Sequence, residues 1–441
     1  MTTPPPRTAN DPTSAYAPRL PLPPIICSDT PGTWAYDTMS RRVDAEILER
    51  TVQDMADDIA QWSKNTTNCE IPARLQALRS SLRSHTTLPP LTAPHDPHDP
   101  VLRKEWEEWQ TILAPYAGET WLTAPWIVAE FYVYRQLMDA LRYFDPVSPG
   151  YQYDPFRVAK TKGLVTSVSS AATSCLRALP PTTQGLAVAV SFALWGNQMD
   201  LSLWPAGSDD GKDRFTSVLE AATNQLLADD TEALTAYCEE LKQRGGGNID
   251  IIVDNAGFEL VTDLVLGQFL VEAGYAKTVT FQTKAHPTFV SDALTKDVLE
   301  TVQYYLHESN TPACVQAAEK WESFLQNGQW RCHQDFFWVQ PTTMWAMTEP
   351  LRSSLQEHTD LAFVKGDANY RRLLGDREWD VSKDSFADVV GKFPVPVCAL
   401  RTLKAELGCG MDADLVATAS KRDPNWMTNG QFGVIQFSKC D

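Results

Sequence analysis

Several features are missing from this 441-residue sequence, and each absence argues against a class of protein. None of the nine cysteines stands in a Cys-x-x-Cys pair, so the sequence predicts neither a zinc knuckle nor a disulfide framework, and a reducing compartment fits best. No apolar run approaches the ~20 residues that a helix needs to cross a bilayer. No Walker motif occurs, and the glycine run at 245–247 precedes a predicted strand, whereas a phosphate-binding loop follows one.

Basic residues are scarce relative to acidic ones. The sequence has 38 Lys and Arg against 56 Asp and Glu, which gives a formal charge of -18. This balance argues against a protein that wraps nucleic acid over a broad surface, although a local basic pocket is compatible with it. We therefore expect no nucleic-acid partner and no membrane partner, and the sequence gives no indication of a protein partner.

The N-terminal segment has almost no capacity to form regular structure. Its first 24 residues contain eight prolines and no continuous apolar stretch, so they cannot form a helix or the hydrophobic segment of a signal peptide. We interpret residues 1–32 as a proline-rich arm that is either flexible or lies along the wall of the folded protein. We expect the protein to be cytoplasmic.

Residues 33–242 are predicted to form a mainly helical subdomain with very few strands. Apolar residues recur there at spacings of three and four, most clearly in 43–62 and 125–144. The segment 86–100 is too rich in proline to be anything but a loop. Its His-Asp-Pro-His-Asp-Pro tract resembles a metal-binding sequence, but the prolines favour a plain loop.

Residues 243–441 have a different character and predict an α/β domain. Short β-branched or aromatic runs alternate there with helical patterns, which is typical of a mostly parallel sheet with crossover helices. The predicted strands are residues 249–254, 277–284, 361–367 and 395–402. Polar residues follow each run, and the carboxyl ends of such strands form the edge at which open α/β sheets bind ligands.

The first two predicted strands end in candidate metal ligands. Asp254 and Asn255 follow the first strand, and Asp292 follows the second, where it is expected to open the next helix. Their oxygen atoms suit a divalent cation such as Mg²⁺, Mn²⁺ or Co²⁺. Helix capping is the alternative for all three residues. Lys284, at the end of the second strand, faces either a phosphate or solvent.

The other two predicted strands end in basic groups. Lys365 and Arg371 flank a glycine-containing turn at the start of a helix, which is a natural phosphate site, although a solvated turn has the same pattern. Arg401 and Lys404 follow the fourth strand. Four strand ends would thus bring acids, an amide and cations to one edge of the sheet. Such a set holds a cation, polarises a phosphoryl oxygen, lowers the pKa of a bound water and clamps the phosphate.

Several spaced strings in this chain resemble the damage-control phosphatase family, in its branch marked by an Arg-Thr-x-Lys motif and also labelled acidic-residue methyltransferase-like. The strings are DNAGFELVTDL, KAHPTFVSD, KGDANYRRLLGD and RTLK, together with PWIVAEFYVYR and LWGNQMDLS in the helical part. The resemblance extends from about residue 33 onward. It implies a three-layer α/β/α sandwich and a phosphatase that uses Mn²⁺, Co²⁺ or Ni²⁺ on sugar phosphates such as fructose 1-phosphate and fructose 6-phosphate.

The resemblance also assigns roles to individual residues. Asp254, Asn255 and Asp292 become metal ligands, and Asp254 and Asp292 become the catalytic pair. The implied substrate contacts are Asp367, Asn369, Tyr370, Arg371 and Lys404, joined by Arg401 and by Asn197 of the LWGNQMDLS string.

The sequence alone allows more than one mechanism, more than one role for Glu259 and more than one function. Phosphate could pass to a metal-activated water, which we favour, or first to Asp254 as an aspartyl-phosphate. Glu259 either shapes the pocket or lies on a solvated helix face. A carboxyl methyltransferase using S-adenosylmethionine, with Glu259 as a contact, and a non-catalytic sugar-phosphate sensor are the alternative functions. The intact set of Asp254, Asn255 and Asp292 favours the metal-dependent phosphatase.

Overall fold

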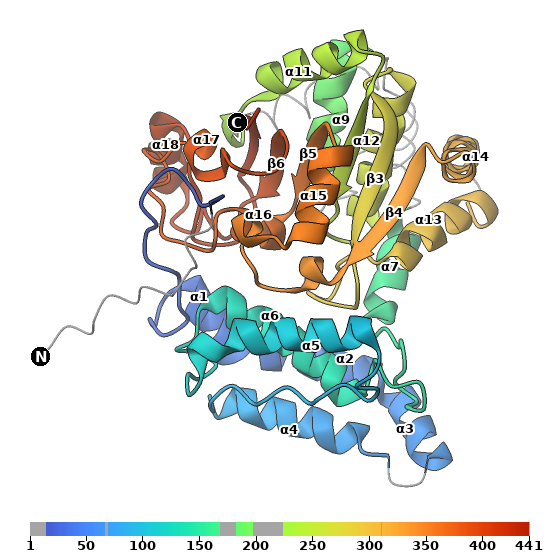
Figure 1. Ribbon diagram of the computed structural model, residues 1–441, viewed down its shortest axis with the longest axis vertical. Helices are drawn as coiled ribbons and strands as arrows, with labels where there is room; N and C mark the ends of the chain where they lie inside the picture. The colour runs from blue at the N-terminus through green and yellow to red at the C-terminus, as the bar shows by residue number, and fades with distance from the viewer. Residues whose placement is uncertain (1–14, 67–68, 168–181, 197–223, 310, 441) are drawn as a thin grey trace, which may run out of the picture.

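The computed structural model describes residues 15–66, 69–167, 182–196, 224–309 and 311–440 (Figure 1). Its centre is a seven-stranded sheet with the strand order β1-β7-β6-β5-β2-β3-β4. Neighbouring strands are parallel except for β6 and β7. The strands are β1 (Leu226–Asp229), β2 (Gly247–Ile252), β3 (Ala276–Lys284), β4 (Trp330–Asp335), β5 (Leu361–Lys365), β6 (Val397–Thr402) and β7 (Gly433–Ser438).

The four predicted strands correspond to β2, β3, β5 and β6, which lie side by side in the sheet. Because these four strands are parallel, their carboxyl ends meet at one edge, as the sequence predicted. The strands β1, β4 and β7 were not predicted. Strand β1 lies within the segment 33–242, which was predicted to be mainly helical, and its four residues are too few to produce a recognisable pattern.

Helices cover both faces of the sheet and make it the middle layer of an α/β/α sandwich. Alternate residues of each strand enter different cores: Leu361 and Phe363 of β5 face one core, and Ala362 and Val364 face the other. The first core contains residues of α9 (Thr183–Trp195), α11 (Thr231–Gln243), α12 (Phe258–Glu272), α13 (Thr295–His307) and α14 (Pro312–Gln326). The second contains residues of α15 (Glu349–His358), α16 (Asp367–Leu373), α17 (Phe386–Val390) and α18 (Ala413–Arg422), with the 3₁₀ turns η4 (Phe336–Val339) and η5 (Met344–Ala346).

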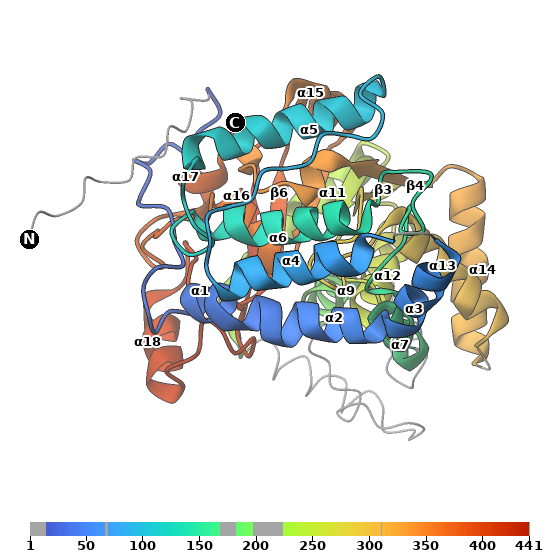
Figure 2. The same ribbon diagram turned by 90° about the horizontal axis from the view of Figure 1, so that it is seen from below.

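The N-terminal helices gather on one side of the sheet (Figures 1 and 2). They are α1 (Trp34–Asp37), the π-helical segment η1 (Thr38–Leu48), α2 (Glu49–Asp54), α3 (Ala56–Asn65), α4 (Ile71–Arg83), α5 (Pro100–Leu113), the 3₁₀ turn η2 (Ala114–Tyr116) and α6 (Trp126–Leu141), followed by α7 (Arg157–Ser167). The predicted loop at 86–100 is confirmed: α5 begins only at Pro100, and Asp99 caps it. The division of the chain at residue 242 stays a prediction. Strand β1 and nearly all of α11 come before this residue, although both belong to the α/β layers.

Helix α6 lies at the carboxyl edge of the sheet and is buried along almost its whole length. The rings of Phe131 and Tyr134 contact Phe289, in the loop after β3, with ring centroids 4.7 Å and 4.8 Å apart. This contact presses the helical part against the edge at which the candidate site lies. No helix among the described residues is long and apolar enough to span a bilayer.

Candidate functional site

Backbone hydrogen bonds join the two loops that carry the predicted metal ligands. Asn255 and Asp292 form an antiparallel bridge. The amide of Ala293 donates to the carbonyl of Asp254 at 2.7 Å, and the amide of Ala256 donates to that of Ser291 at 2.6 Å. The structure therefore brings Asp254, Asn255 and Asp292 together, as the sequence predicted.

None of these three side chains caps a helix. Helix α12 begins at Phe258 after Gly257, and no side chain caps it. The expectation that Asp292 opens the next helix is wrong, because α13 begins at Thr295. Before this helix, Asp292 pairs with Asn255 in the loop that follows β2. The alternative explanation of these residues as helix caps is therefore excluded.

Gly366 brings a third strand end against Asp254. It follows β5 with a φ of 82°, and a Cβ placed on it would lie 2.0 Å from Oδ2 of Asp254. A side chain would thus clash with the carboxylate and strain the backbone. The turn between β5 and α16 can approach the acid this closely only with glycine.

Hydrogen bonds with three residues orient the amide of Asn255. Its Nδ2 donates to Oδ2 of Asp254 at 2.7 Å and to Oε2 of Glu259 at 2.8 Å. Its Oδ1 accepts from the hydroxyl of Ser291 at 2.5 Å. The partners therefore distinguish the nitrogen of this amide from its oxygen. Ser291 was not singled out from the sequence, because a serine before an aspartate has the form of an ordinary helix start.

Two lysines are buried beneath these ligands. Lys284 Nζ lies 3.3 Å from Oδ2 of Asp292 and donates to Oδ1 of Asn369 at 3.0 Å. With its side chain only 1% exposed, Lys284 cannot face solvent, so that alternative is wrong. The second lysine, Lys365, pairs with Glu259 at 3.1 Å and with Asp263 at 2.9 Å.

Burial of the carboxyl groups dominates the electrostatics of the site. It raises the pKa of Asp254 well above its usual range, and the nearby charges of Glu259 and Asp292 raise it further. Burial likewise raises the pKa of Asp292 to about 6, against the opposing charge of Lys284. Glu259 is buried as well, so the solvated-face alternative for it is wrong. Burial raises the pKa of Asp263 to about 7, although Lys365 lowers it.

This charge arrangement fits a divalent cation. A cation at Asp254 and Asp292 would offset both the repulsion and the lost hydration that raise their pKa values. Over the described ranges, no three His, Cys, Asp or Glu side chains converge in a way that could hold a metal. The predicted set contains only two side chains of these types, because its third predicted ligand is the amide of Asn255.

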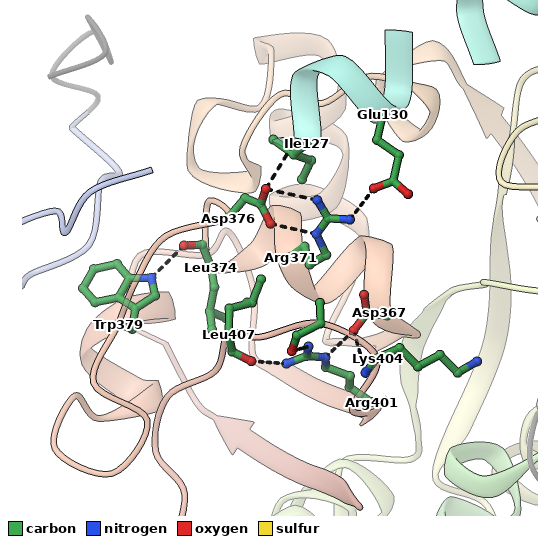
Figure 3. Close-up of polar contacts among 11 residues, drawn as sticks. Ile127, Glu130, Asp367, Arg371, Leu374, Asp376, Trp379, Arg401, Lys404 and Leu407 are labelled. Carbon is green, nitrogen blue, oxygen red and sulfur yellow. Dashed lines mark hydrogen bonds and ion pairs between the residues drawn. The ribbon is translucent and has the colours of Figure 1, made fainter. Parts of the chain in front are cut away.

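The carboxyl end of β6 carries two basic residues, the buried Arg401 and the partly exposed Lys404 (Figure 3). Arg401 is buried; its Nε donates to Oδ1 of Asp367 at 2.8 Å, and its other nitrogens donate to the carbonyls of Leu407 and Ala405. The backbone amide of Lys404 lies 3.3 Å from the same Asp367 oxygen. Its side chain points away from Arg401, and its charge lowers the pKa of Asp254.

The remaining residues of α16 face the interior. Arg371 donates to Asp376 at 2.7 Å and 3.1 Å and to Glu130 of α6 at 2.6 Å (Figure 3). Its guanidinium lies 3.6 Å from the ring centroid of Trp126. The hydroxyl of Tyr370 donates to Gln436 at 2.7 Å.

Asn369 donates to the carbonyl oxygens of Val253 and Lys365. Asn369, Tyr370 and Arg371 therefore hold α16 in place, whereas the side chain of Lys404 is partly exposed. Asn197 lies outside the described residues.

This chain is similar to known proteins over most of its length. The family model described as "Damage-control phosphatase ARMT1-like domain" matches residues 38–417. Curated relatives named Damage-control phosphatase ARMT1 include the Danio rerio protein, 32% identical over 92% of this chain and 95% of its own length. The Xenopus laevis protein is also 32% identical, over 92% of this chain and 97% of its own length.

Among solved structures, a DUF89 family protein from Pyrococcus horikoshii is similar, with 18% identity and a TM-score of 0.41, covering 78% of this chain and 96% of that one. The family model and the curated relatives both extend over most of the chain. The chain therefore belongs to the damage-control phosphatase ARMT1-like family, whose members are metal-dependent phosphomonoester hydrolases.

Proposed function

We propose that this protein hydrolyses the phosphomonoester of a small sugar phosphate, such as fructose 1-phosphate or fructose 6-phosphate, with a divalent cation held by Asp254, Asn255 and Asp292. Mn²⁺, Co²⁺ or Ni²⁺ is the expected ion, and Mg²⁺ has the same preference for oxygen ligands. The observation that carries the proposal is a pair of buried carboxylates that cap no helix, with the pKa of Asp254 raised by burial and by the nearby charges of Glu259 and Asp292.

The bound cation would polarise the phosphoryl oxygen and activate water. The protein would contribute positive charge from two sides. Lys284, already between Asp292 and Asn369, holds a fixed ammonium group beside the metal ligands. Lys404, partly exposed at the same edge, would contact the phosphate, and Asp367 would face the sugar from the start of α16. Such fixed charges stabilise a transferring phosphoryl group without reorganising.

In this proposal the other predicted substrate residues do not contact the substrate; they support the residues that do. Arg371 and Arg401 are saturated by carboxylates, carbonyls and aromatic rings, so they would fix the turns that carry Asp367 and Lys404. The guanidinium of Arg401 lies 4.5 Å from the ring centroid of Tyr370, and this contact would also help to fix those turns. A cytoplasmic location is part of the proposal.

Phosphate release by metal-stripped protein tests the proposal directly. We expect turnover of fructose 1-phosphate or fructose 6-phosphate only after Mn²⁺, Co²⁺, Ni²⁺ or Mg²⁺ is restored, and a loss of at least about 100-fold in Asp254→Asn. Glu357→Gln, at an exposed carboxylate of α15, is the matched control and should keep full activity. Folded wild-type protein that releases no phosphate with any of these metals would refute the proposal.

The variant Gly366→Ala, compared with a second glycine of positive φ, tests the contact with the Asp254 carboxylate separately from backbone strain. A Cβ at this position displaces the Asp254 carboxylate, so metal binding measured by calorimetry should fall together with turnover. Gly118→Ala is the control, since Gly118 also has a positive φ, 89°, but nothing lies within 4 Å of its added Cβ. Equal metal affinity in both variants would show that the contact with Asp254 is unimportant.

A further inference from the structure

A chain of buried charged side chains leads away from the predicted metal ligands. Glu259 and Asp263 lie one turn apart on α12, and Lys365 is the last residue of β5. The ammonium nitrogen of Lys365 lies 3.1 Å from Oε1 of Glu259 and 2.9 Å from Oδ1 of Asp263. The three side chains are at most 5% exposed, so the two ion pairs lie inside the protein.

This chain of charges ends at the amide of Asn255. Oε2 of Glu259 accepts from Nδ2 of Asn255 at 2.8 Å, whereas Oε1 of Glu259 accepts from Lys365. Each oxygen of the carboxylate is thus held by a different group, so Lys365 fixes the acceptor that orients the amide. The amide oxygen has two lone pairs and uses one for the hydroxyl of Ser291, so the other can bind a cation.

The main chain of Lys365 connects it to the rest of the site. Its carbonyl oxygen accepts from Nδ2 of Asn369 on α16 at 2.9 Å. The next residue is Gly366, which packs against the carboxylate of Asp254. Lys365 therefore contacts α12 through its side chain and α16 through its backbone, at the point where β5 meets the predicted metal ligands.

Stability alone does not account for these buried charges. Charged groups lose their hydration on burial, and apolar residues of similar size in place of a buried ion pair commonly leave a protein equally or more stable. The neighbouring side chains of Leu260, Val261 and Leu264 on α12 are fully buried and apolar. An apolar side chain in place of Asp263 would therefore suit this core, and the charges call for a functional explanation.

We propose that Lys365 and Asp263 are positioning residues for the predicted metal ligand Asn255. Asp263 holds the ammonium group of Lys365, and Lys365 holds the carboxylate of Glu259. Glu259 then holds the amide nitrogen of Asn255, which leaves the amide oxygen for the cation. Residues that orient a metal ligand without touching the ion commonly change metal affinity 10- to 100-fold. This inference rests on the proposed function, because it concerns the same divalent cation.

The paired variant Lys365→Met with Asp263→Leu tests this role. It removes one positive and one negative charge, so the net charge near the cation stays the same. We expect Mn²⁺ affinity, measured by calorimetry on the metal-stripped full-length protein, to fall about tenfold. The matched control is Arg135→Met with Glu105→Leu, which removes a similarly buried ion pair from the helical part and should leave the affinity unchanged. Asp263→Asn is a milder variant of similar shape, and a smaller loss in the same direction is expected.

A third substitution distinguishes positioning from a general effect on the fold. Glu259→Gln alone should also weaken Mn²⁺ binding about tenfold, because Lys365 no longer holds a charged acceptor. If Lys365 and Asp263 act through Glu259, adding their substitutions to Glu259→Gln should lower the affinity by less than about twofold further. A merely structural pair would instead cause the same loss in both backgrounds.

The proposal is overturned if the paired variant and Asp263→Asn bind Mn²⁺ as tightly as wild type, or if the losses add in full. Phosphate release, assayed in parallel, separates this outcome from the proposed function. Wild-type protein that binds Mn²⁺ with the expected pattern but releases no phosphate would refute the phosphatase alone. Wild-type protein that binds no Mn²⁺ would refute both.

Discussion

At the scale of single residues, the candidate site depends on how side chains are held. Asn255 has a defined amide orientation because Ser291 donates to its oxygen while Asp254 and Glu259 accept from its nitrogen. Residues that orient a metal ligand commonly change metal affinity 10- to 100-fold, although they never touch the ion. Ser291 therefore belongs to the site as a positioning residue.

Ser291→Ala should weaken Mn²⁺ binding about tenfold, because the amide of Asn255 loses the hydroxyl that donates to its oxygen. Calorimetry with the metal alone measures this effect without any assay of turnover. Ser291→Thr keeps a hydroxyl and should restore most of the affinity. Ser353→Ala, an exposed serine on α15, controls for the loss of a serine hydroxyl. Unchanged affinity in Ser291→Ala would remove Ser291 from the site.

At the scale of elements, the sequence predicted those whose pattern is local. The strands β2, β3, β5 and β6 are buried runs of β-branched and apolar residues, so their composition alone indicates them. By contrast, β4 at the sheet edge is largely solvent-facing and polar, and the alternation of Trp330 and Cys332 with polar residues is too short to indicate a strand. The sequence correctly brought Asp254 and Asp292 to the same edge of the sheet, because both follow parallel neighbouring strands, although Asp292 does not open α13 as expected.

Strand β2 also contains a buried acid, Asp250, that makes stability depend on pH. It accepts from Gln282 at 2.7 Å and from Thr359 at 3.1 Å, yet burial raises its pKa to about 6 from 3.8. Since the folded state then binds the proton more tightly than the unfolded state, this group makes folding less favourable as the pH rises from about 4 to 6.

Asp250→Asn should therefore gain stability relative to wild type as the pH rises across this window, by up to about 3 kcal/mol, and the difference should level off above pH 6. Urea unfolding of both proteins between pH 4 and 8 measures it. The amide can still accept from Gln282 and donate to the Thr359 hydroxyl. Parallel stability curves for the two proteins would show that Asp250 keeps an ordinary pKa.

At the scale of the whole molecule, the helical part covers the active edge of the sheet. Glu130 and Trp126 of α6 both contact Arg371, and the amide of Ile127 donates to Asp376 at 3.1 Å. No local pattern could have revealed this connection, since Glu130 and Arg371 lie 241 residues apart in the chain. The sequence predicted both layers but not how they are joined.

Glu130→Gln should lower the free energy of unfolding by about 1 to 3 kcal/mol, because it removes a charged acceptor from a buried guanidinium. Chemical denaturation measures the change. Glu107→Gln, at an exposed glutamate of α5, should alter stability by less than about 0.5 kcal/mol. A loss in Glu130→Gln no larger than in this control would mean that the contact contributes little to docking of the helical part.

The close approach of Gly366 to Asp254 has a consequence for reading the genomes of related organisms. A relative could keep every predicted metal ligand and still carry alanine or a larger residue where this chain has Gly366. Its carboxylate could not then occupy the place that Asp254 occupies here. We expect such relatives to be pseudoenzymes, so this one glycine would separate catalysts from inactive descendants that retain the acidic motif intact.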